Sequence, residues 1–190
     1  MKLIDKKFKN NCFRYFFQCG IATITIVGIL MYLRTVDHGA IIASLGASTF
    51  ITFTMPHSYD SQVRRLLGGY LIGVSCGIVC YFTAVYAYSK GLLPSTDTST
   101  VVFGGFAVGL AMFLMSIMNA EHAPAAGMAL ALVLNSWSGG TIVFIFASVA
   151  WLIFVKIVLA NYLLDFRDLP IGSVNRKMPP KMNSFSKRLY

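Results

Sequence analysis

The stretch GASTFITFTMPHSYDSQVRRLLGGY, residues 46–70, interrupts two apolar runs with a proline, a pair of arginines and a pair of glycines. Hydrophobic residues make up 56% of the 190-residue chain and charged residues only 12%, about half of the charged share in a soluble domain. So few charges cannot cover a water-facing surface. We therefore expect an integral membrane protein, in which this stretch joins two membrane segments.

The hydropathy pattern predicts apolar segments at residues 15–33, 39–55, 66–88, 101–118, 123–134 and 141–164. Lipid offers no partner for backbone polar groups, so these segments are expected to be helices. A span needs about 17 to 25 residues; the second segment barely reaches this length, and the fifth falls short of it. The sequence predicts an all-α membrane protein with six membrane segments, two of which are half-helices or re-entrant helices.

The two ends of the chain differ in composition from this membrane domain, which covers residues 15–164. Residues 1–14 are basic and partly amphipathic, which predicts a lead-in that lies on the inner leaflet. Residues 165–190 are expected to form a basic cytoplasmic tail that is attracted to anionic lipid headgroups. The first apolar segment has no small-residue cleavage site behind it, so we expect it to stay as a span.

The basic residues indicate a topology. If all six segments cross the bilayer, every lysine and arginine except Arg34, Lys90 and Lys156 falls on the side that holds both termini. Cytoplasmic loops are rich in these residues, so we expect both termini in the cytoplasm, beneath a bacterial inner membrane. The alternative is four crossings with two re-entrant or peripheral segments, which would move Arg64 and Arg65 to the outer side.

Long and short segments repeat in the same order. Each half of the chain reads long, short, long, and each short segment follows an acid–histidine pair, Asp37-His38 or Glu121-His122. Three crossings make the second half enter the membrane from the opposite side. The halves are therefore predicted to be inverted repeats, in which the short segments indicate the binding site.

Glycines recur every fourth residue in the third and fourth segments, a spacing that lets helices pack closely in lipid. Such faces fit contacts within one chain and contacts in a homo-oligomer equally well. The positions are Gly69, Gly73, Gly77, Gly105 and Gly109.

The sequence lacks the residues that several classes of function require. Cys76 and Cys80 lie one helical turn apart, but no histidine or carboxylate nearby completes a metal site, so neither a metal nor another cofactor is expected. The net charge of +9 lies mainly beside the spans, where it favours lipid headgroups over nucleic acid. Zinc-hydrolase, serine-hydrolase and P-loop signatures are absent, and we do not expect an enzyme.

The opening stretch resembles the hallmark of the HPP family of integral membrane proteins. That family's pattern runs Gly-Ala-Ser, a short apolar stretch, Pro, then Ser-Pro-Leu-Ala-Gln-Pro-Arg-Asn, two apolar residues and Gly-Gly-His. The chain departs from it at Val63, Arg65 and Tyr70. It matches, in register, at Gly46-Ala47-Ser48, Phe53, Pro56, Ser58, Gln62, Arg64 and Gly68-Gly69.

The family's naming motif, His-Pro-Pro followed by Ala-Gly-Ala, is similar to EHAPAAGMALAL at residues 121–132. Here His122 and Pro124 correspond, while Ala123 replaces the first proline and the glycine is displaced to Gly127. The resemblance covers roughly residues 15–164. It implies transport of a small anion, because plant members in the chloroplast envelope are known as nitrite transporters.

We therefore expect a transporter or channel for a small inorganic anion, with nitrite or nitrate as its substrate and the lipid bilayer as its surroundings. One alternative is a small membrane subunit or sensor that transports nothing itself. Another is a membrane-embedded enzyme that would use His122 with Glu121.

Candidate substrate-binding residues carry groups that suit an anion. The planar guanidinium of Arg64 matches planar oxygens, Lys156 is a cation within a span, and His122 can take a proton beside an anion. Each has a structural alternative: a topology anchor, a snorkelling lysine and a helix-boundary histidine. The short helices would add backbone N–H groups at their N-termini, small residues that let a ligand approach the backbone, and hydroxyl donors. The alternative is that these small and hydroxyl residues only pack helices. The positions are Gly46, Ala47, Ser48, Thr49, Ala126 and Gly127.

Overall fold

A computed structural model describes residues 6–33 and 39–166. The described chain contains helices and connections without any strand, which confirms the all-α prediction. The pair Asp37-His38 and nearly all of the predicted basic tail lie outside the described residues. The elements are α1 (Lys6–Leu33), α2 (Gly39–Thr54), the 3₁₀ turn η1 (Tyr59–Ser61), α3 (Val63–Ser89), α4 (Thr96–Ile117), α5 (Ala123–Leu134) and α6 (Gly139–Leu159).

Four helices are long and apolar enough to cross a membrane: α1, over Asn11–Met31, and α3, α4 and α6 along their whole lengths. The remaining two, α2 with 16 residues and α5 with 12 residues, are short and apolar. At 1.5 Å per residue, α5 is about 18 Å long, whereas the hydrocarbon layer is about 30 Å thick. The protein is an integral membrane protein whose two short helices depend on protein partners at their ends.

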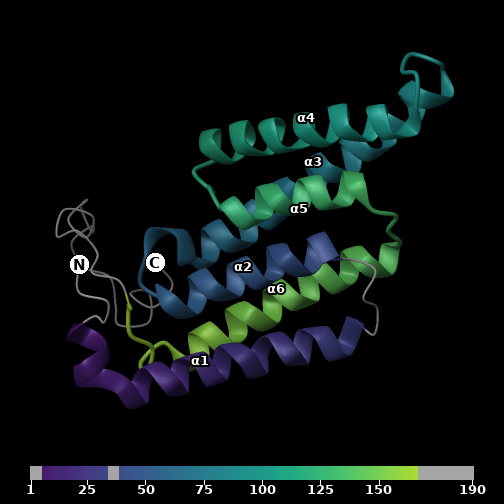
Figure 1. The fold of residues 1–190 in the computed structure, drawn as a ribbon. Coiled ribbons are helices and arrows are strands. Elements are labelled where there is room, and N and C mark those ends of the chain that lie inside the picture. The colour runs from purple at the N-terminus through teal and green to yellow at the C-terminus, as the bar shows by residue number, and fades with distance from the viewer. Residues whose placement is uncertain (1–5, 34–38, 167–190) are drawn as a thin grey trace.

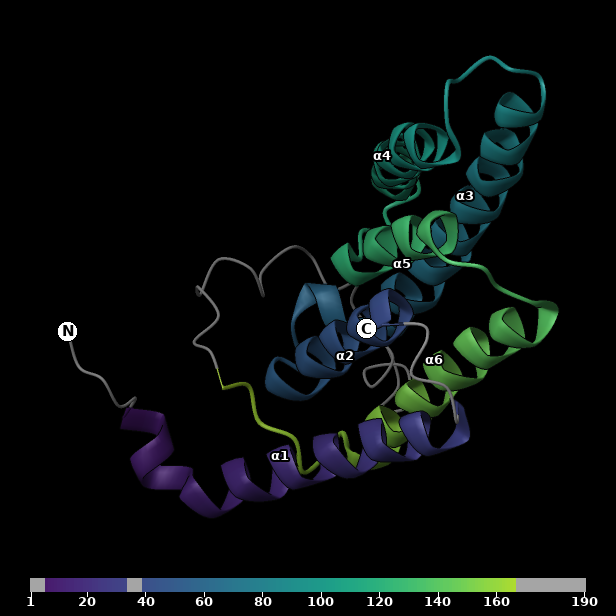
Figure 2. The same cartoon turned by 45° about the vertical axis from the view of Figure 1, so that its right-hand side comes forward.

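The helices form a layered bundle in which the short helices occupy the middle (Figure 1). α4 lies at one edge and α1 at the opposite edge, and Figure 2 shows the same order after rotation. Between them, α5 packs against α3 and α4, α2 packs against α1 and α6, and the two short helices contact each other. Successive helices run in alternating directions (Figure 1).

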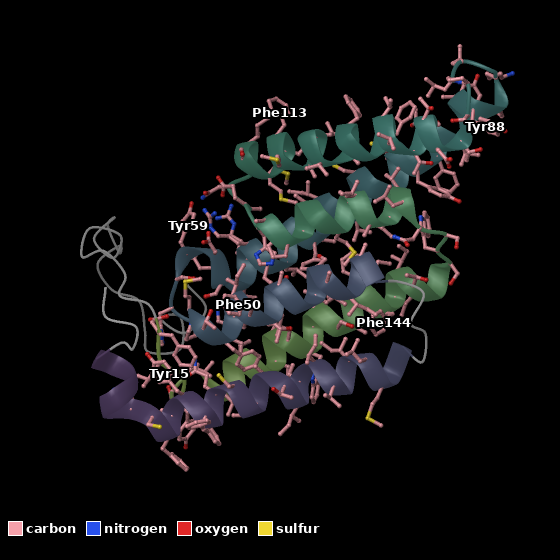
Figure 3. The ribbon with its side chains drawn as sticks, viewed as in Figure 1. Tyr15, Phe50, Tyr59, Tyr88, Phe113 and Phe144 are labelled. Atoms are coloured by element: carbon pink, nitrogen blue, oxygen red, sulfur yellow. The ribbon has the colours of Figure 1, made fainter. Side chains whose placement is uncertain are left out.

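The N-terminal part of the α1 span and the C-terminal limit of the described chain meet at one end of the bundle. The ring of Tyr15 stacks on that of Phe166, with centroids 3.9 Å apart. The side-chain amide of Gln18 donates to the carbonyls of Phe53 and Leu164, and its oxygen accepts from the Leu164 N–H at 3.0 Å. These bonds of the buried Gln18 connect α1 to the end of α2 and to the segment that follows α6. Tyr15 and Tyr59 lie at this end, and Tyr88 lies at the other (Figure 3).

Local sequence sets where the helices bend, begin and end. α1 bends at Asn11 (φ −133°, ψ 25°), so its first turn departs from the axis of the span, three residues earlier than the predicted end of the lead-in. Ser95 caps α4 by accepting from the Thr98 N–H. Gly91 (φ 68°) and Asn119 (φ 53°) follow α3 and α4 in the left-handed conformation that ends helices.

Glycines bring the backbones of α3 and α5 into contact. A Cβ atom at Gly73 would lie 2.2 Å from the carbonyl oxygen of Ala125, and one at Gly77 would lie 2.9 Å from that of Ala129. No side chain fits there, so the glycine spacing serves close helix packing at this interface. Gly105 and Gly109 differ, since a Cβ atom at either would meet nothing within 4 Å.

Candidate functional site

A group of buried polar side chains lies where the two short helices meet. We call Ser44 and Ser48 of α2, Tyr70 of α3 and His122 at the start of α5 the hydroxyl–imidazole cluster. The Ser48 hydroxyl lies 2.8 Å from His122 Nε2 and 2.8 Å from the Tyr70 hydroxyl. All four residues are buried, so the membrane domain carries a polar centre that packing alone does not require.

Helical periodicity brings these groups together. Ser44 and Ser48 are four residues apart and therefore share one face of α2, which packs against α5. His122 is the N-cap residue of α5, and Pro124 in the first turn fixes the start of that helix. Gly69 allows α3 to approach this point, because a Cβ atom there would lie 2.6 Å from the His122 Cβ. The neighbouring Tyr70 thereby enters the same layer.

The hydrogen bonds of the cluster have a definite direction. His122 Nδ1 lies 3.2 Å from the carbonyl oxygen of Asp60, which can only accept, so Nδ1 carries the proton. In the neutral ring Nε2 is then an acceptor, and Ser48 donates to it. Ser44 donates to the carbonyl of Pro124. The Tyr70 hydroxyl therefore donates to Ser48, which completes a chain from Tyr70 through Ser48 to His122.

A second polar group closes the same end of the bundle, and we call it the end clamp: Tyr59, Arg65, Asn119 and Glu121. Arg65 is buried at 1% exposure, while the Glu121 side chain is 46% exposed. The guanidinium donates to the Glu121 carboxylate and the Asn119 side-chain oxygen, and it stacks over the Tyr59 ring. Tyr59 also donates to Asn119 at 2.7 Å. The clamp joins the α2–α3 connection to the α4–α5 connection.

Lys156 of α6 also reaches the α2–α3 connection. Its ammonium donates to the backbone carbonyl of Ser61 and, at 3.1 Å, to the Ser61 hydroxyl. The structure gives Lys156 no ion pair within residues 6–33 and 39–166. Two buried hydroxyls at this end, those of Thr52 and Ser58, have no hydrogen-bond partner among the described residues.

Two connection residues have shifted acidities. Burial lowers the pKa of His122 to about 4, the Asp60 carbonyl partly opposes this effect, and the charge of Lys156 adds to it. The Glu121 backbone N–H lowers the pKa of its own carboxyl group, and Arg65 adds to that effect. Near neutral pH the cluster therefore holds an uncharged imidazole beside an ionised clamp.

The structure brings some of the predicted site residues together. Ser48 and His122 are in direct contact, Ala126 is buried, and Lys156 reaches the nearby connection through Ser61. Thr49 is buried, but its hydroxyl donates to the carbonyl of Leu45 within its own helix. The other predicted positions lie apart from the cluster: Arg64, Ala47 and Gly127 are exposed and Gly46 is half-buried.

Tyr70 and Arg65 were not among the site residues predicted from the sequence. A signal existed for Tyr70, since it stands where the HPP pattern has a histidine, another hydrogen-bonding ring. For Arg65 no comparable signal existed. Adjacent helical residues point about 100° apart, and only the position of Glu121 decides which arginine of the pair turns inward.

Comparison with known proteins agrees with this architecture. The family described as HPP, transmembrane region, matches residues 8–170. The chain belongs to the HPP family. A transmembrane protein of Dictyostelium discoideum is 28% identical over 127 residues, which is 64% of this chain and 41% of that protein. The HPP chain described here thus spans about two fifths of that relative's length. No solved structure matches.

Proposed function

We propose that this HPP-family protein transports a small inorganic anion, with nitrite or nitrate as the leading substrates, and that it is not an enzyme. The observation that carries the proposal is the buried contact between Ser48 and His122 at the junction of the two short helices. Polar side chains inside a membrane domain are costly to keep there and commonly line solute paths. Short helices meeting in the middle of a bundle are typical of transporter sites.

The chemistry of this region favours an anion over a cation. Lys156 supplies a positive charge without an ion pair in the described chain, and Arg65 is already neutralised by Glu121. The buried hydroxyls of Thr52 and Ser58 have no hydrogen-bond partner among residues 6–33 and 39–166, so they can donate to a ligand. Hydroxyl and ammonium donors suit the oxygens of nitrite and nitrate. The exposed Arg64 is proposed to attract anions to this end of the protein.

We also propose that α1–α3 and α4–α6 are inverted repeats. Exchanging α1 with α4, α2 with α5 and α3 with α6 turns each main helix contact into another one that is present. For example, the contact of α1 with α2 becomes that of α4 with α5, and the contact between α2 and α5 becomes itself. This pattern supports a path that opens to either side by rocking the halves.

The orientation and assembly proposed for the protein follow from charge and packing. Both termini are proposed to be cytoplasmic, in a bacterial inner membrane, because nearly all basic residues belong to that side when six segments cross. The uncovered Gly105 and Gly109 of α4 are consistent with lipid contact or a homo-oligomer.

The proposal is tested by anion uptake into proteoliposomes, comparing nitrite, nitrate and chloride. Lys156→Gln is expected to reduce uptake at least tenfold, because it removes the ammonium that has no ion pair in the described chain. The matched control is Lys90→Gln, since Lys90 is exposed at the opposite end and contacts only the Tyr86 ring in the described chain. Absence of uptake for all three anions by folded wild-type protein would overturn the proposal.

A further inference from the structure

The hydroxyl–imidazole cluster forms a directed chain of hydrogen bonds around His122. In the neutral state Tyr70 donates to Ser48, Ser48 donates to Nε2, and Nδ1–H donates to the Asp60 carbonyl. The Nε2 lone pair is thus turned into the centre of the bundle, toward the two hydroxyls. A proton that reaches this centre has one basic nitrogen to bind.

We propose that His122 binds one proton at Nε2 with each transported anion, so that the protein is a proton–anion symporter. This inference rests on the proposed function and adds the ion that drives it. The proton is taken from water on one side of the membrane and returned to water on the other. No covalent bond of the anion changes, and the charges of the proton and the anion cancel.

The network can hold His122 in both protonation states. Once Nε2 carries a proton, it donates to Ser48, and the Ser48 hydrogen turns toward the Tyr70 oxygen. Tyr70 then needs another acceptor, and both the hydroxyl and the backbone carbonyl of Ser44 lie 3.3 Å from its oxygen. Every group keeps a partner after this reversal, which avoids the cost of an unsatisfied buried polar atom.

The charges around His122 make the proton and the anion depend on each other. α6 contributes a cation, Lys156, and the acid beside His122 in the chain, Glu121, is bound to Arg65 of α3. α2 and α3 otherwise present hydroxyls, and η1 presents the Asp60 carbonyl rather than its carboxylate. No carboxylate contacts His122 in the described chain, so an imidazolium there needs an anion as its counter-charge. Each ligand therefore strengthens the binding of the other.

The test measures nitrate accumulation in proteoliposomes under an inward proton gradient, with the membrane potential held at zero by potassium and valinomycin. Nitrate is chosen because its strong parent acid does not leak through lipid. One proton per anion predicts about tenfold accumulation for each pH unit of gradient, since one unit corresponds to a tenfold equilibrium ratio. His122→Gln, whose amide can still bond Ser48 but cannot be protonated, is expected to accumulate no nitrate under the gradient.

The possible outcomes separate the inference from the proposed function. Wild-type uptake that follows the membrane potential and ignores the pH gradient would overturn the inference and leave anion transport in place. Coupled uptake that survives in His122→Gln would also overturn it, because the proton would bind elsewhere. Absence of any anion uptake by the wild-type protein would overturn both.

Tyr70→Phe provides a second variant in case His122→Gln does not fold. Phenylalanine keeps the ring and its packing but removes the bond between Tyr70 and Ser48 in both protonation states. In the neutral state Ser48 still donates to Nε2, whereas in the protonated state the Ser48 hydrogen loses its acceptor, so the variant disfavours the protonated arrangement. Nitrate accumulation driven by the proton gradient is expected to require a more acidic external pH in this variant than in the wild type. An unchanged external pH dependence would contradict the relay.

Discussion

The two short helices, α2 and α5, are both apolar but pack against their neighbours in different ways. α5 offers its backbone: the carbonyls of Ala125 and Ala129 lie against the glycines of α3. α2 offers side chains: Ser44 and Ser48 project hydroxyls toward α3 and α5. One helix is thus held by close approach and the other by hydrogen bonds.

This difference gives the two helices different roles at the site. Small residues and backbone contacts make the α3–α5 interface rigid, because interiors packed at this density tolerate little extra volume. The hydroxyl face of α2 can exchange hydrogen-bond partners without moving its backbone. We infer that α5 fixes the position of His122, whereas α2 supplies the part of the network that changes.

Gly73→Ala is expected to cause the largest loss of stability. Its added Cβ would lie 2.2 Å from the Ala125 carbonyl oxygen, so α3 and α5 must separate, at a cost of about 3 kcal/mol or more. The measurement is the free energy of unfolding in detergent micelles. Gly105→Ala is the matched control, since it adds the same methyl group to a helix where nothing lies within 4 Å. Equal effects of the two variants would contradict the packing described for α5.

Acid is expected to act on the α5 side through His122. The unfolded chain binds a proton near the ordinary pKa of 6.5, while burial in the folded protein lowers that pKa to about 4. Above about pH 6.5 the titration of His122 therefore does not reduce the free energy of unfolding. As the pH drops toward 4, this free energy falls by at most about 1.4 kcal/mol per pH unit. Thermal unfolding of wild-type protein and His122→Gln across this range provides the measurement. A variant as acid-sensitive as the wild type would assign the titration to another group.

Glu121→Gln is expected to weaken the end clamp and to lower the free energy of unfolding. It leaves the buried guanidinium of Arg65 without its counter-charge, and removing one partner of such a pair costs more than the pair contributes. Asp97→Asn, at the exposed first turn of α4, is the control and is expected to cost less than about 1 kcal/mol. Chemical denaturation in micelles compares the two, and a larger loss for Asp97→Asn would show that the clamp contributes little.

Ser48→Ala is expected to have the smallest effect on stability, about 1 kcal/mol, because hydrogen bonds between membrane helices are individually weak. Its effect on transport is expected to be much larger, since it cuts the chain between Tyr70 and His122. Ser75→Ala removes an exposed hydroxyl that bonds only within its own helix and should change neither. Anion uptake and melting temperature together separate the role of Ser48 in transport from its role in stability. Uptake by Ser48→Ala at the wild-type rate would show that the α2 hydroxyl is not needed for transport.

Much of the fold was readable from the sequence, because lipid permits few alternatives. The fifth apolar segment, 123–134, coincides with α5. The other predicted segments overlap their helices with ends displaced by up to five residues, except that α1 begins nine residues before residue 15. Apolar length alone determines such segments. Their ends depend on capping and on polar residues such as Thr96 and Thr98, which extend α4 beyond its apolar part.

The site was less predictable, because its members come together through tertiary packing. Ser48 and His122 were candidates for their chemistry, yet the bond between them depends on α2 crossing α5. For the arginine pair the sequence favoured Arg64, whereas Arg65 is the buried one. A single sequence contains no information on that choice until the α4–α5 connection is placed beside α3.

Gln18 has a consequence for how the chain is made. Its partners include both backbone groups of Leu164, which lies 146 residues later in the chain. During synthesis α1 is made before α6, and the amide of Gln18 must wait without these partners until the segment after α6 has been translated, although unpaired polar groups are costly in lipid. The docking of α1 is therefore completed late, only when the segment that follows α6 has reached it.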